Sequence, residues 1–338
     1  MNIFLNGCYG ACNLGDDIMM DIVIRDIKKI FDTNVVFNIR SKGNSTCHID
    51  DPNIHYIHQN RYEEVLAIKK SNYYIWGGGT FLYENKDNGF KSIFSIFLHL
   101  LLARLFRSKI IFYSIGYGPF LTKKTAFLAK LMIRMSDFIT ARDEISYHEL
   151  FKINPNTIYT EDLVYRLNVT KNITKKSSDI IDIVINSVYY SSTLELEQFS
   201  NFIIQTIEKI KKTNSKIMLH FIAAWDSNDN SDTKSNLKLL NLLQDKMPFD
   251  YKIYSQIDKT AIISLIQNSK IVIAHRLHIL LIATLFDKEI YTLAYHSKVT
   301  KFLAQINYHN GKYEKNLINM AIDKSNQNFT SLKTYLKK

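Results

Sequence analysis

Short apolar runs of β type alternate with segments of helical periodicity through the first half of the chain. Isoleucines recur at helical spacing from Ile18 to Ile30 and predict an amphipathic helix. The pair Asp16-Asp17 precedes them, and we expect it to cap that helix. Strands are predicted at residues 1–5, 35–39, 73–76, 110–115 and 138–141. Each strand runs into a glycine turn or a charged residue, so functional groups should gather at the strand ends.

The second half repeats this alternation. Strands are predicted at residues 180–187, 216–223, 251–254, 270–274 and 289–294. Helices are predicted at residues 194–212, 235–246, 259–267, 277–286 and 298–306. Regular β-α alternation implies parallel sheets with right-handed crossovers. We therefore expect an α/β protein with two Rossmann-like, doubly wound domains that face each other across a cleft, as in the glycosyltransferase-B (GT-B) architecture.

A polar stretch without apolar periodicity separates the two halves and is the expected linker. A length of 338 residues also favours two domains over one. We predict an N-terminal Rossmann-like domain at 1–167 on the acceptor side, which contains Arg142, and a linker at 168–178. A donor-binding C-terminal Rossmann-like domain at 179–310 and a C-terminal helical tail at 311–338 complete the expected organisation.

Composition narrows the class of protein. A hydrophobic content of 46% is ample for burial, and the first residues lack the basic head and apolar stretch of a secretory signal. We therefore expect a cytoplasmic protein. Cys8, Cys12 and Cys47 show neither a Cys-x-x-Cys motif nor the spacing of a zinc site, so we expect no disulfide, no metal site and no metal cofactor.

The net charge of +11 is unevenly distributed, because Lys91 to Met135 contains no acidic residue. The basic residues of this zone are Lys91, Arg104, Arg107, Lys109, Lys123, Lys124, Lys130 and Arg134. Its apolar stretch 93–106 is shorter than the roughly 20 residues that span a bilayer. It is either a core helix with solvated lysines or a peripheral contact with anionic lipid at the inner face of the membrane. No nucleic-acid-binding motif accompanies the charge, so we expect no nucleic acid partner.

Candidate chemistry concentrates where a predicted strand meets a predicted helix at Ile271–His278. The apolar run ends in His275, Arg276 and His278, which can bind an anion and donate a proton near neutral pH. Arg142 occupies a similar junction. Its guanidinium can take a phosphate or carboxylate in bidentate fashion, or it can pair with a neighbouring acid, Asp143 or Glu144.

Two glycine-bearing loops of the first half also end strands. The loop at residues 7–17 lacks the dinucleotide-binding spacing, and its acids would repel a pyrophosphate at the helix start. Asp16 therefore suits an acceptor hydroxyl, or else it binds free backbone amides of the helix. The run Gly77-Gly78-Gly79 lets a ligand approach the backbone closely, or it forms a tight turn.

Taken together, these motifs give the chain a recognisable order. It resembles the polysaccharide pyruvyltransferase family over about residues 3–305. The motifs that carry the resemblance are Asn13-Leu14-Gly15-Asp16, Gly77-Gly78-Gly79, Gly116-Tyr117-Gly118-Pro119, Arg142-Asp143 with Ser146, Glu161-Asp162, His275-Arg276-Leu277-His278, and Tyr295 followed by Lys298.

The resemblance implies transfer of a pyruvyl group from phosphoenolpyruvate to two hydroxyls of a sugar in a cell-surface polysaccharide or its precursor. A pyruvate ketal forms and phosphate is released, with phosphoenolpyruvate as donor substrate and no cofactor. The acceptor is a glycan or a lipid-linked sugar. The resemblance makes His278 the general acid and Arg142, Arg276 and Lys298 the donor-binding residues.

The remaining expected site residues are less directly tied to the chemistry. Asp16 is expected to orient or deprotonate the acceptor hydroxyl, and Asn13, Gly78 and Gly79 are expected to line the substrate site. His275 is either an orienting group or a packed imidazole. Two other functions fit the same architecture: a nucleotide-sugar-dependent glycosyltransferase and a catalytically silent sugar-binding subunit. Cations at every matched position argue against the silent subunit.

Overall fold

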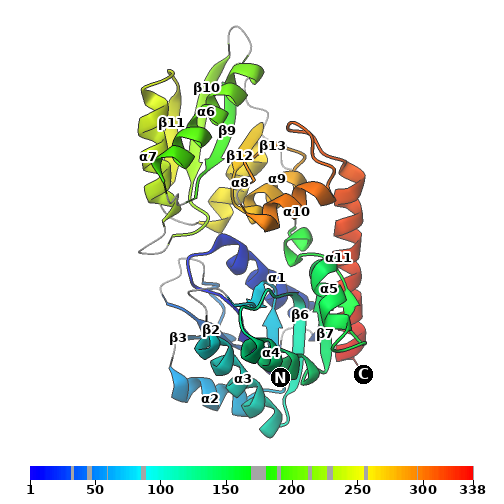
Figure 1. The fold of residues 1–338 in the computed structure, drawn as a ribbon. Coiled ribbons are helices and arrows are strands. Elements are labelled where there is room, and N and C mark those ends of the chain that lie inside the picture. Colours follow the sequence, from blue (N-terminus) through cyan, green and yellow to red (C-terminus); the bar gives the residue numbers. More distant parts are fainter. Residues whose placement is uncertain are drawn as a thin grey trace. The chain divides into compact units, whose positions relative to one another are not determined.

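The computed structural model describes residues 1–31, 34–43, 48–58, 60–84, 89–168, 180–188, 192–211, 215–226, 231–254, 258–294 and 296–337. Contacts divide the chain into two compact units, drawn in Figure 1. Unit 1 comprises Met1–Ala11, Asp16–Leu167 and Ala321–Lys338. Unit 2 comprises Cys12–Gly15 and Asn168–Met320. From residue 169 onward, the predicted linker lies outside the described residues.

Unit 1 contains a parallel sheet with the strand order β3-β2-β1-β4-β6-β7-β8, and β5 pairs with β6. Its strands are β1 (Asn2–Asn6), β2 (Val36–Ser41), β3 (Ile54–His58), β4 (Tyr73–Gly77), β5 (Thr80–Leu82), β6 (Lys109–Tyr117), β7 (Phe138–Ala141) and β8 (Ile158–Tyr159). The central strands are apolar and buried, as expected of a parallel sheet that is covered on both faces.

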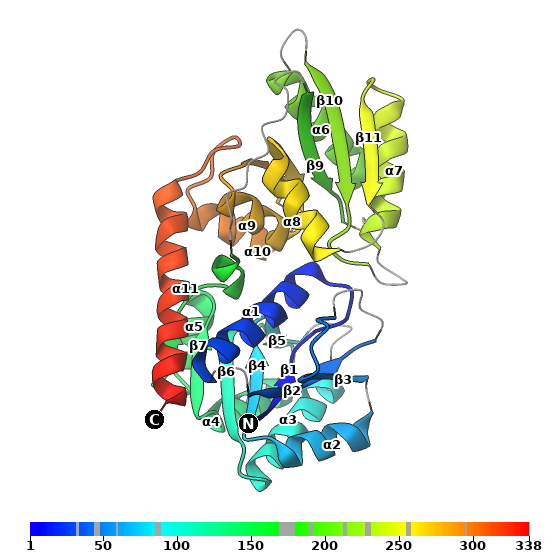
Figure 2. The same ribbon diagram turned by 180° about the vertical axis from the view of Figure 1, so that it is seen from behind.

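Helices cover both faces of this sheet (Figures 1 and 2). They are α1 (Leu14–Phe31), α2 (Arg61–Lys70), α3 (Phe90–Leu105), α4 (Lys123–Arg134), α5 (Glu144–Phe151), the 3₁₀ helix η1 (Leu163–Arg166) and the last part of α11 (Lys315–Leu336). One hydrophobic cluster packs α2, α3, α4 and α5 against one face. Helix α1 lies on the opposite face (Figure 2).

Unit 2 contains a second parallel sheet, with the strand order β11-β10-β9-β12-β13. Its strands are β9 (Ile180–Asn186), β10 (Lys216–Ile222), β11 (Asp250–Tyr254), β12 (Ile271–Ala274) and β13 (Glu289–Tyr291). Its helices are α6 (Thr193–Ile210), α7 (Asp232–Gln244), α8 (Lys259–Asn268), α9 (Leu277–Leu285) and α10 (Ser297–Gln305). Helices α6 and α7 share one core with the sheet.

The predicted class, two doubly wound parallel α/β sheets, is confirmed. The expected N-cap is wrong. Helix α1 already begins at Leu14, so Asp16 and Asp17 lie in its first turn, and Asp17 accepts a hydrogen bond from the Gly10 backbone N–H at 3.0 Å. Strand β3 and helix α2 were not predicted, because the polar residues of both segments obscure their periodicity.

A buried ion pair joins distant segments of unit 1. Arg166 of η1 donates from Nε and Nη2 to the two carboxylate oxygens of Asp26, both at 2.8 Å. The Tyr113 hydroxyl of β6 donates to the same carboxylate at 3.1 Å. Arg166 Nη1 donates to Asn326 of α11 at 2.7 Å. One carboxylate of α1 thus connects η1, β6 and the C-terminal helix.

The first prediction concerns this ion pair. Arg166→Met removes the two shorter contacts of the buried Asp26 carboxylate and leaves it Arg25, whose Nη2 lies 3.4 Å from Oδ1. The substitution should lower the free energy of unfolding by about 3 kcal/mol. Urea denaturation measures it. Lys152→Met is the control, since it removes a surface pair with Glu149 and should cost less than about 1 kcal/mol. Equal effects of the two substitutions would contradict the structural role of Asp26.

Candidate functional site

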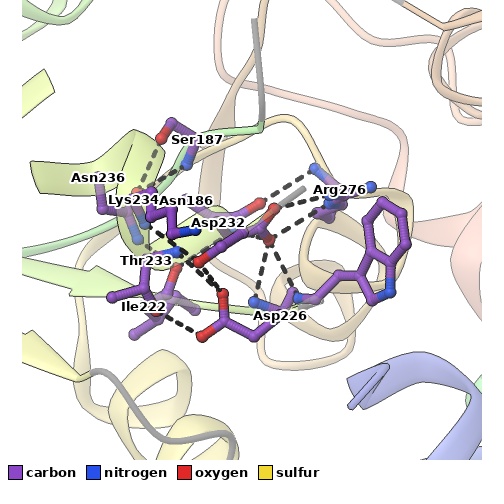
Figure 3. Close-up of polar contacts among 12 residues, drawn as sticks. Asn186, Ser187, Ile222, Asp226, Asp232, Thr233, Lys234, Asn236 and Arg276 are labelled. Carbon is purple, nitrogen blue, oxygen red and sulfur yellow. Dashed lines mark hydrogen bonds and ion pairs between the residues drawn. The ribbon is translucent and has the colours of Figure 1, made fainter. Parts of the chain in front are cut away.

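A buried carboxylate lies at the carboxyl edge of the unit 2 sheet. Asp232, the first residue of α7, is inaccessible to solvent. Its Oδ2 accepts hydrogen bonds from the backbone N–H groups of Ala224 and Trp225, both at 3.1 Å, and from Asn186 Nδ2 at 3.0 Å. Figure 3 shows the arrangement. Several donors therefore satisfy this carboxylate, as a buried charge requires.

Asp232 also fixes the side chain of Arg276. Arg276 Nη2 donates to Asp232 Oδ1 at 2.6 Å, and Arg276 Nε donates to Oδ2 at 3.3 Å (Figure 3). On another side, the guanidinium carbon lies 4.9 Å from the centre of the Trp225 ring. The arginine side chain remains 23% exposed. A guanidinium held between a carboxylate and an indole has a fixed orientation, although Asp232 offsets part of its charge.

Two buried asparagines tie the strand ends together around this pair. Asn186 and Asn236 both donate to the Ile222 carbonyl, at 3.2 and 2.9 Å. Asn186 Oδ1 accepts from the Arg276 backbone N–H at 3.2 Å, and Asn236 Oδ1 accepts from the Ser187 hydroxyl at 2.9 Å (Figure 3). Hydrogen bonds of these asparagine side chains thus connect the ends of β9, β10 and β12.

His278 lies in the first turn of α9, two residues after Arg276. The backbone of Gly15 packs against its ring, because a Cβ atom placed on Gly15 would lie 1.8 Å from His278 Nδ1. Leu14 N donates to the Ala224 carbonyl at 2.9 Å, and Asn13 forms a β-bridge with Trp225. Residues 12–15, although early in the sequence, therefore belong to the same edge of unit 2 as Arg276 and His278.

His275 packs in the core of unit 2. It is 1% exposed, and its ring centre lies 3.9 Å from that of Phe199 in an edge-to-face arrangement. Burial lowers the pKa of His275 to about 3, against a hydrogen bond to the Asn186 backbone that raises it. Of the two interpretations given for this residue, the structure shows the packed imidazole.

Lys298, the second residue of α10, is exposed. Its backbone N–H donates to Nδ1 of His296 at 3.2 Å. Burial lowers the pKa of His296, and the charges of Lys298, Arg276 and Lys301 lower it further. The charges of Arg276 and Lys298 therefore both lower the pKa of the His296 imidazole within unit 2. Tyr295, also part of the resemblance, lies outside the described residues.

Arg142 is buried in unit 1, with 9% exposure. Its Nη2 donates to the Thr80 hydroxyl at 2.6 Å. The guanidinium also lies 3.5 Å from Asp162 Oδ2 and 3.6 Å from Asp143 Oδ2. The ion pair with Asp143 is therefore present. Two carboxylates offset much of the charge that Arg142 could offer to an anion.

Asp16 and the triple glycine also meet in unit 1. A Cβ atom on Gly79 would lie 3.3 Å from Asp16 Oδ1, whereas one on Gly78 would lie 2.5 Å from the sulfur of Met19. Both glycines have positive φ, +72° and +76°, which other residues rarely adopt. Gly78 thus makes room for Met19 of α1, and Gly79 lies against Asp16.

A further acid in unit 1 was named in the resemblance without a role. Burial raises the pKa of Glu161 to about 7, although the hydrogen bond from Tyr159 and the charge of Lys324 lower it. The Tyr159 hydroxyl donates to Glu161 Oε1 at 2.9 Å, and Lys324 Nζ lies 3.8 Å from that oxygen. A carboxyl group that titrates near neutrality is suited to proton transfer.

No sequence pattern identified Asp232, Asn186, Asn236 or Trp225 as site residues. Each lies more than one element away from Arg276 along the chain, so only the strand order brings them together. Ser231-Asp232 at a helix start was the one available signal, and N-caps of that kind are common. Among the described residues, no group of His, Cys, Asp and Glu side chains is arranged to hold a metal ion.

Comparison with known families identifies the family to which the chain belongs. A sequence model of the family described as polysaccharide pyruvyl transferase matches residues 13–297. The chain belongs to the polysaccharide pyruvyl transferase family. The matched range of this transferase includes every predicted site residue except Lys298, because it ends at residue 297. No curated protein sequence matches the chain.

Solved structures resemble this family member in fold. UDP-GlcNAc 2-epimerase from Neisseria meningitidis, bound to UDP-GlcNAc, has 12% identity and a TM-score of 0.56, covering 100% of both chains. The epimerase from Methanocaldococcus jannaschii has 12% identity and a TM-score of 0.55, covering 95% of this chain and 91% of its own. An alpha-glucosyltransferase in complex with UDP has 8% identity and a TM-score of 0.50, covering 100% of both chains. The fold is therefore GT-B-like.

The second prediction concerns the buried His275. The folded protein keeps this imidazole neutral, whereas the unfolded chain binds a proton below about pH 6.5. Between the folded-state pKa of about 3 and the unfolded-state pKa of about 6.5, the unfolded state binds more protons. The free energy of unfolding therefore falls as the pH drops through this range. His275 should account for a loss of about 2 kcal/mol between pH 7 and pH 5, measured by urea denaturation at both values.

His275→Gln should lack this pH-dependent loss, even if it is less stable at pH 7. The matched control is His148→Gln, because His148 is 62% exposed and should leave the pH dependence as it is in the wild type. Glu161 contributes in the opposite direction, because its raised pKa stabilises the folded state as the pH falls. This contribution is the same in the wild type and in His275→Gln, so it cancels when the two are compared. An unchanged slope in His275→Gln would refute the assignment.

Proposed function

We propose that this chain transfers a pyruvyl group from phosphoenolpyruvate to two hydroxyls of a sugar in a cell-surface polysaccharide or its precursor. The products are a cyclic pyruvate ketal and inorganic phosphate. Membership of the family supports the reaction class. The single observation that carries the proposal is the placement of Arg276 at the N-cap and His278 in the first turn of α9.

The donor brings a phosphate and a carboxylate, so its site needs fixed positive charge. Arg276 supplies a guanidinium held by Asp232, and the N-terminus of α9 adds backbone N–H groups and a favourable dipole. Lys298 contributes to the same electrostatic environment, as its effect on His296 indicates. In this proposal Arg142 is a further donor-binding cation from unit 1.

The proposed reaction begins with protonation of the donor. The His278 imidazolium gives its proton to the methylene carbon of phosphoenolpyruvate, which leaves positive charge on the carbon that bears the phosphate oxygen. A sugar hydroxyl oxygen attacks that carbon, and Asp16 accepts the hydroxyl proton. The second hydroxyl then replaces phosphate, whose departure Arg276 assists by neutralising its charge. The proton of this hydroxyl restores the His278 imidazolium, and Asp16 releases its proton to solvent. Phosphoenolpyruvate and a diol thus give one ketal and one phosphate.

Gly15 has a defined role in this scheme. Its backbone packs against the His278 ring and holds the imidazole in place. A side chain at position 15 would occupy the space that the ring takes. Leu14 and Asn13 hold that loop on Ala224 and Trp225. A proton donor needs this fixed position, because misplacement by about 1 Å can cost two orders of magnitude in rate.

The third prediction tests the general acid. His278→Ala should lower phosphate release from phosphoenolpyruvate, in the presence of candidate glycan acceptors, by at least about 100-fold. Binding of phosphoenolpyruvate should persist, because the cations remain. His309→Ala, which removes an exposed imidazole of the same unit, is the control and should release phosphate at the wild-type rate. Full activity of His278→Ala would eliminate His278 as the acid.

The fourth prediction tests the donor site without requiring an acceptor. Trp225 lies against Arg276, so its fluorescence should report occupancy in a Trp76→Phe background, which leaves Trp225 as the single tryptophan. Phosphoenolpyruvate should change this fluorescence saturably. Arg276→Met should weaken its binding at least about tenfold, while Lys238→Met, at an exposed position of α7, should not.

Two further arms of this titration separate the competing assignments. Arg142→Met should also weaken phosphoenolpyruvate binding, and an unchanged affinity would remove Arg142 from the donor site. UDP-GlcNAc, the ligand of the Neisseria meningitidis epimerase, should give no saturable response. Binding of UDP-GlcNAc without any response to phosphoenolpyruvate would contradict the proposed function and favour a nucleotide-sugar enzyme.

A further inference from the structure

Helix α3 is apolar on two opposite faces. One face packs into the core of unit 1 through Ile93, Ile96, Leu100 and Ala103, all buried. A helix that covers one face of a sheet ordinarily turns charged or polar residues to solvent. The solvent side of α3 instead carries a continuous row of large apolar side chains, which packing within unit 1 does not explain.

The outward row is narrow and regular. At 100° per residue, its members fall within about 80° of arc around the helix axis, opposite the buried face. They are Phe90, Phe94, Leu98, Leu101 and Leu105, with exposed fractions of 43%, 41%, 43%, 42% and 72%. The rings of Phe90 and Phe94 stack with centroids 5.7 Å apart. Such a contiguous exposed stripe is typical of an interaction surface.

Basic residues border this row. Helix α4 packs beside α3 and exposes Phe127 together with Lys123, Lys124, Lys130 and Arg134. Lys91 of α3 is exposed next to Phe90. Because the chain contains no acid between Lys91 and Met135, no carboxylate from this segment offsets their charge. We call the exposed side chains of α3 and α4 the α3–α4 surface.

We propose that the α3–α4 surface binds the headgroup region of an anionic lipid bilayer. The phenylalanines and leucines of α3 enter the boundary between headgroups and acyl chains, and the lysines of α4 meet lipid phosphates. This combination of an apolar face and a basic border is the recognised form of an interfacial helix. No helix among the described residues is long and apolar enough to cross a membrane, so the contact is peripheral.

Charge decides between a bilayer and a second copy of the chain as the occupant. Two copies joined through this surface would bring their α4 lysines together, and like charges across an interface are unfavourable. An anionic bilayer offers the opposite charge and an apolar layer at once. The inference concerns a surface of unit 1 that takes no part in the proposed pyruvyl transfer, and it can fail without affecting that proposal.

Vesicle flotation of the full chain tests the inference. At low salt, the protein should float with vesicles of phosphatidylcholine mixed with phosphatidylglycerol, and it should float poorly with phosphatidylcholine alone. High salt should reduce binding to the anionic vesicles, because screening weakens the lysine contacts. Leu98→Glu combined with Leu101→Glu should lower the partition coefficient at least about tenfold, since it places carboxylates in the centre of the row.

Two further variants test the basic residues of the surface and control for the effect of adding a carboxylate elsewhere on the protein. Lys123→Glu with Lys124→Glu should also lower binding at least about tenfold, while Leu237→Glu, at a site 45% exposed on α7, should not change it. All positions are exposed, and thermal unfolding verifies that each variant folds. Absence of wild-type binding to anionic vesicles at low salt would overturn the inference, as would unchanged binding by the Leu98/Leu101 variant.

The mass of the protein in lipid-free solution tests whether the α3–α4 surface instead joins two copies of the chain. Light scattering should show the same oligomeric state for the wild type and the Leu98/Leu101 variant. A wild-type dimer that this variant dissociates would instead assign the α3–α4 surface to a second copy of the chain and overturn the membrane proposal.

Discussion

The buried carboxylate of Asp232 is the contact on which the carboxyl edge of unit 2 depends. A charge in that position is tolerable only because two backbone N–H groups, an asparagine and an arginine donate to it. Those donors come from the ends of different strands, so satisfying one carboxylate fixes the relative positions of all of them. The rigidity of the carboxyl edge of the unit 2 sheet therefore follows from an electrostatic requirement.

The neighbouring imidazoles differ because their surroundings differ. His275 belongs to the end of the strand and is enclosed by Phe199, whereas His278 belongs to the first turn of α9 and remains partly exposed. Arg276 lies between them in sequence and points to Asp232. A change from strand to helix at Arg276 thus separates a structural imidazole from a candidate proton donor within four residues.

Much of the fold could be predicted, because alternating apolar runs and helical periodicity are local signals. The junction of β12 and α9 is an example, and its predicted limits differ from the observed ones by one residue. Arg276 and His278 could be selected for the same reason. Asp232 and Trp225 could not, since their proximity to Arg276 depends on the order β10-β9-β12. The packing of Gly15 on His278 likewise depends on tertiary contacts that no local pattern encodes.

The two ends of unit 1 lie far apart along the chain. Residues 321–338 complete that unit, and through Asn326 they contact the arginine that neutralises Asp26. During synthesis these residues leave the ribosome after all of residues 168–320. Unit 2 can thus finish folding while unit 1 still lacks its last helix, although the N-terminal part of a chain usually folds first. Assembly of unit 1 is thus completed by a helical segment that is translated after the residues of unit 2.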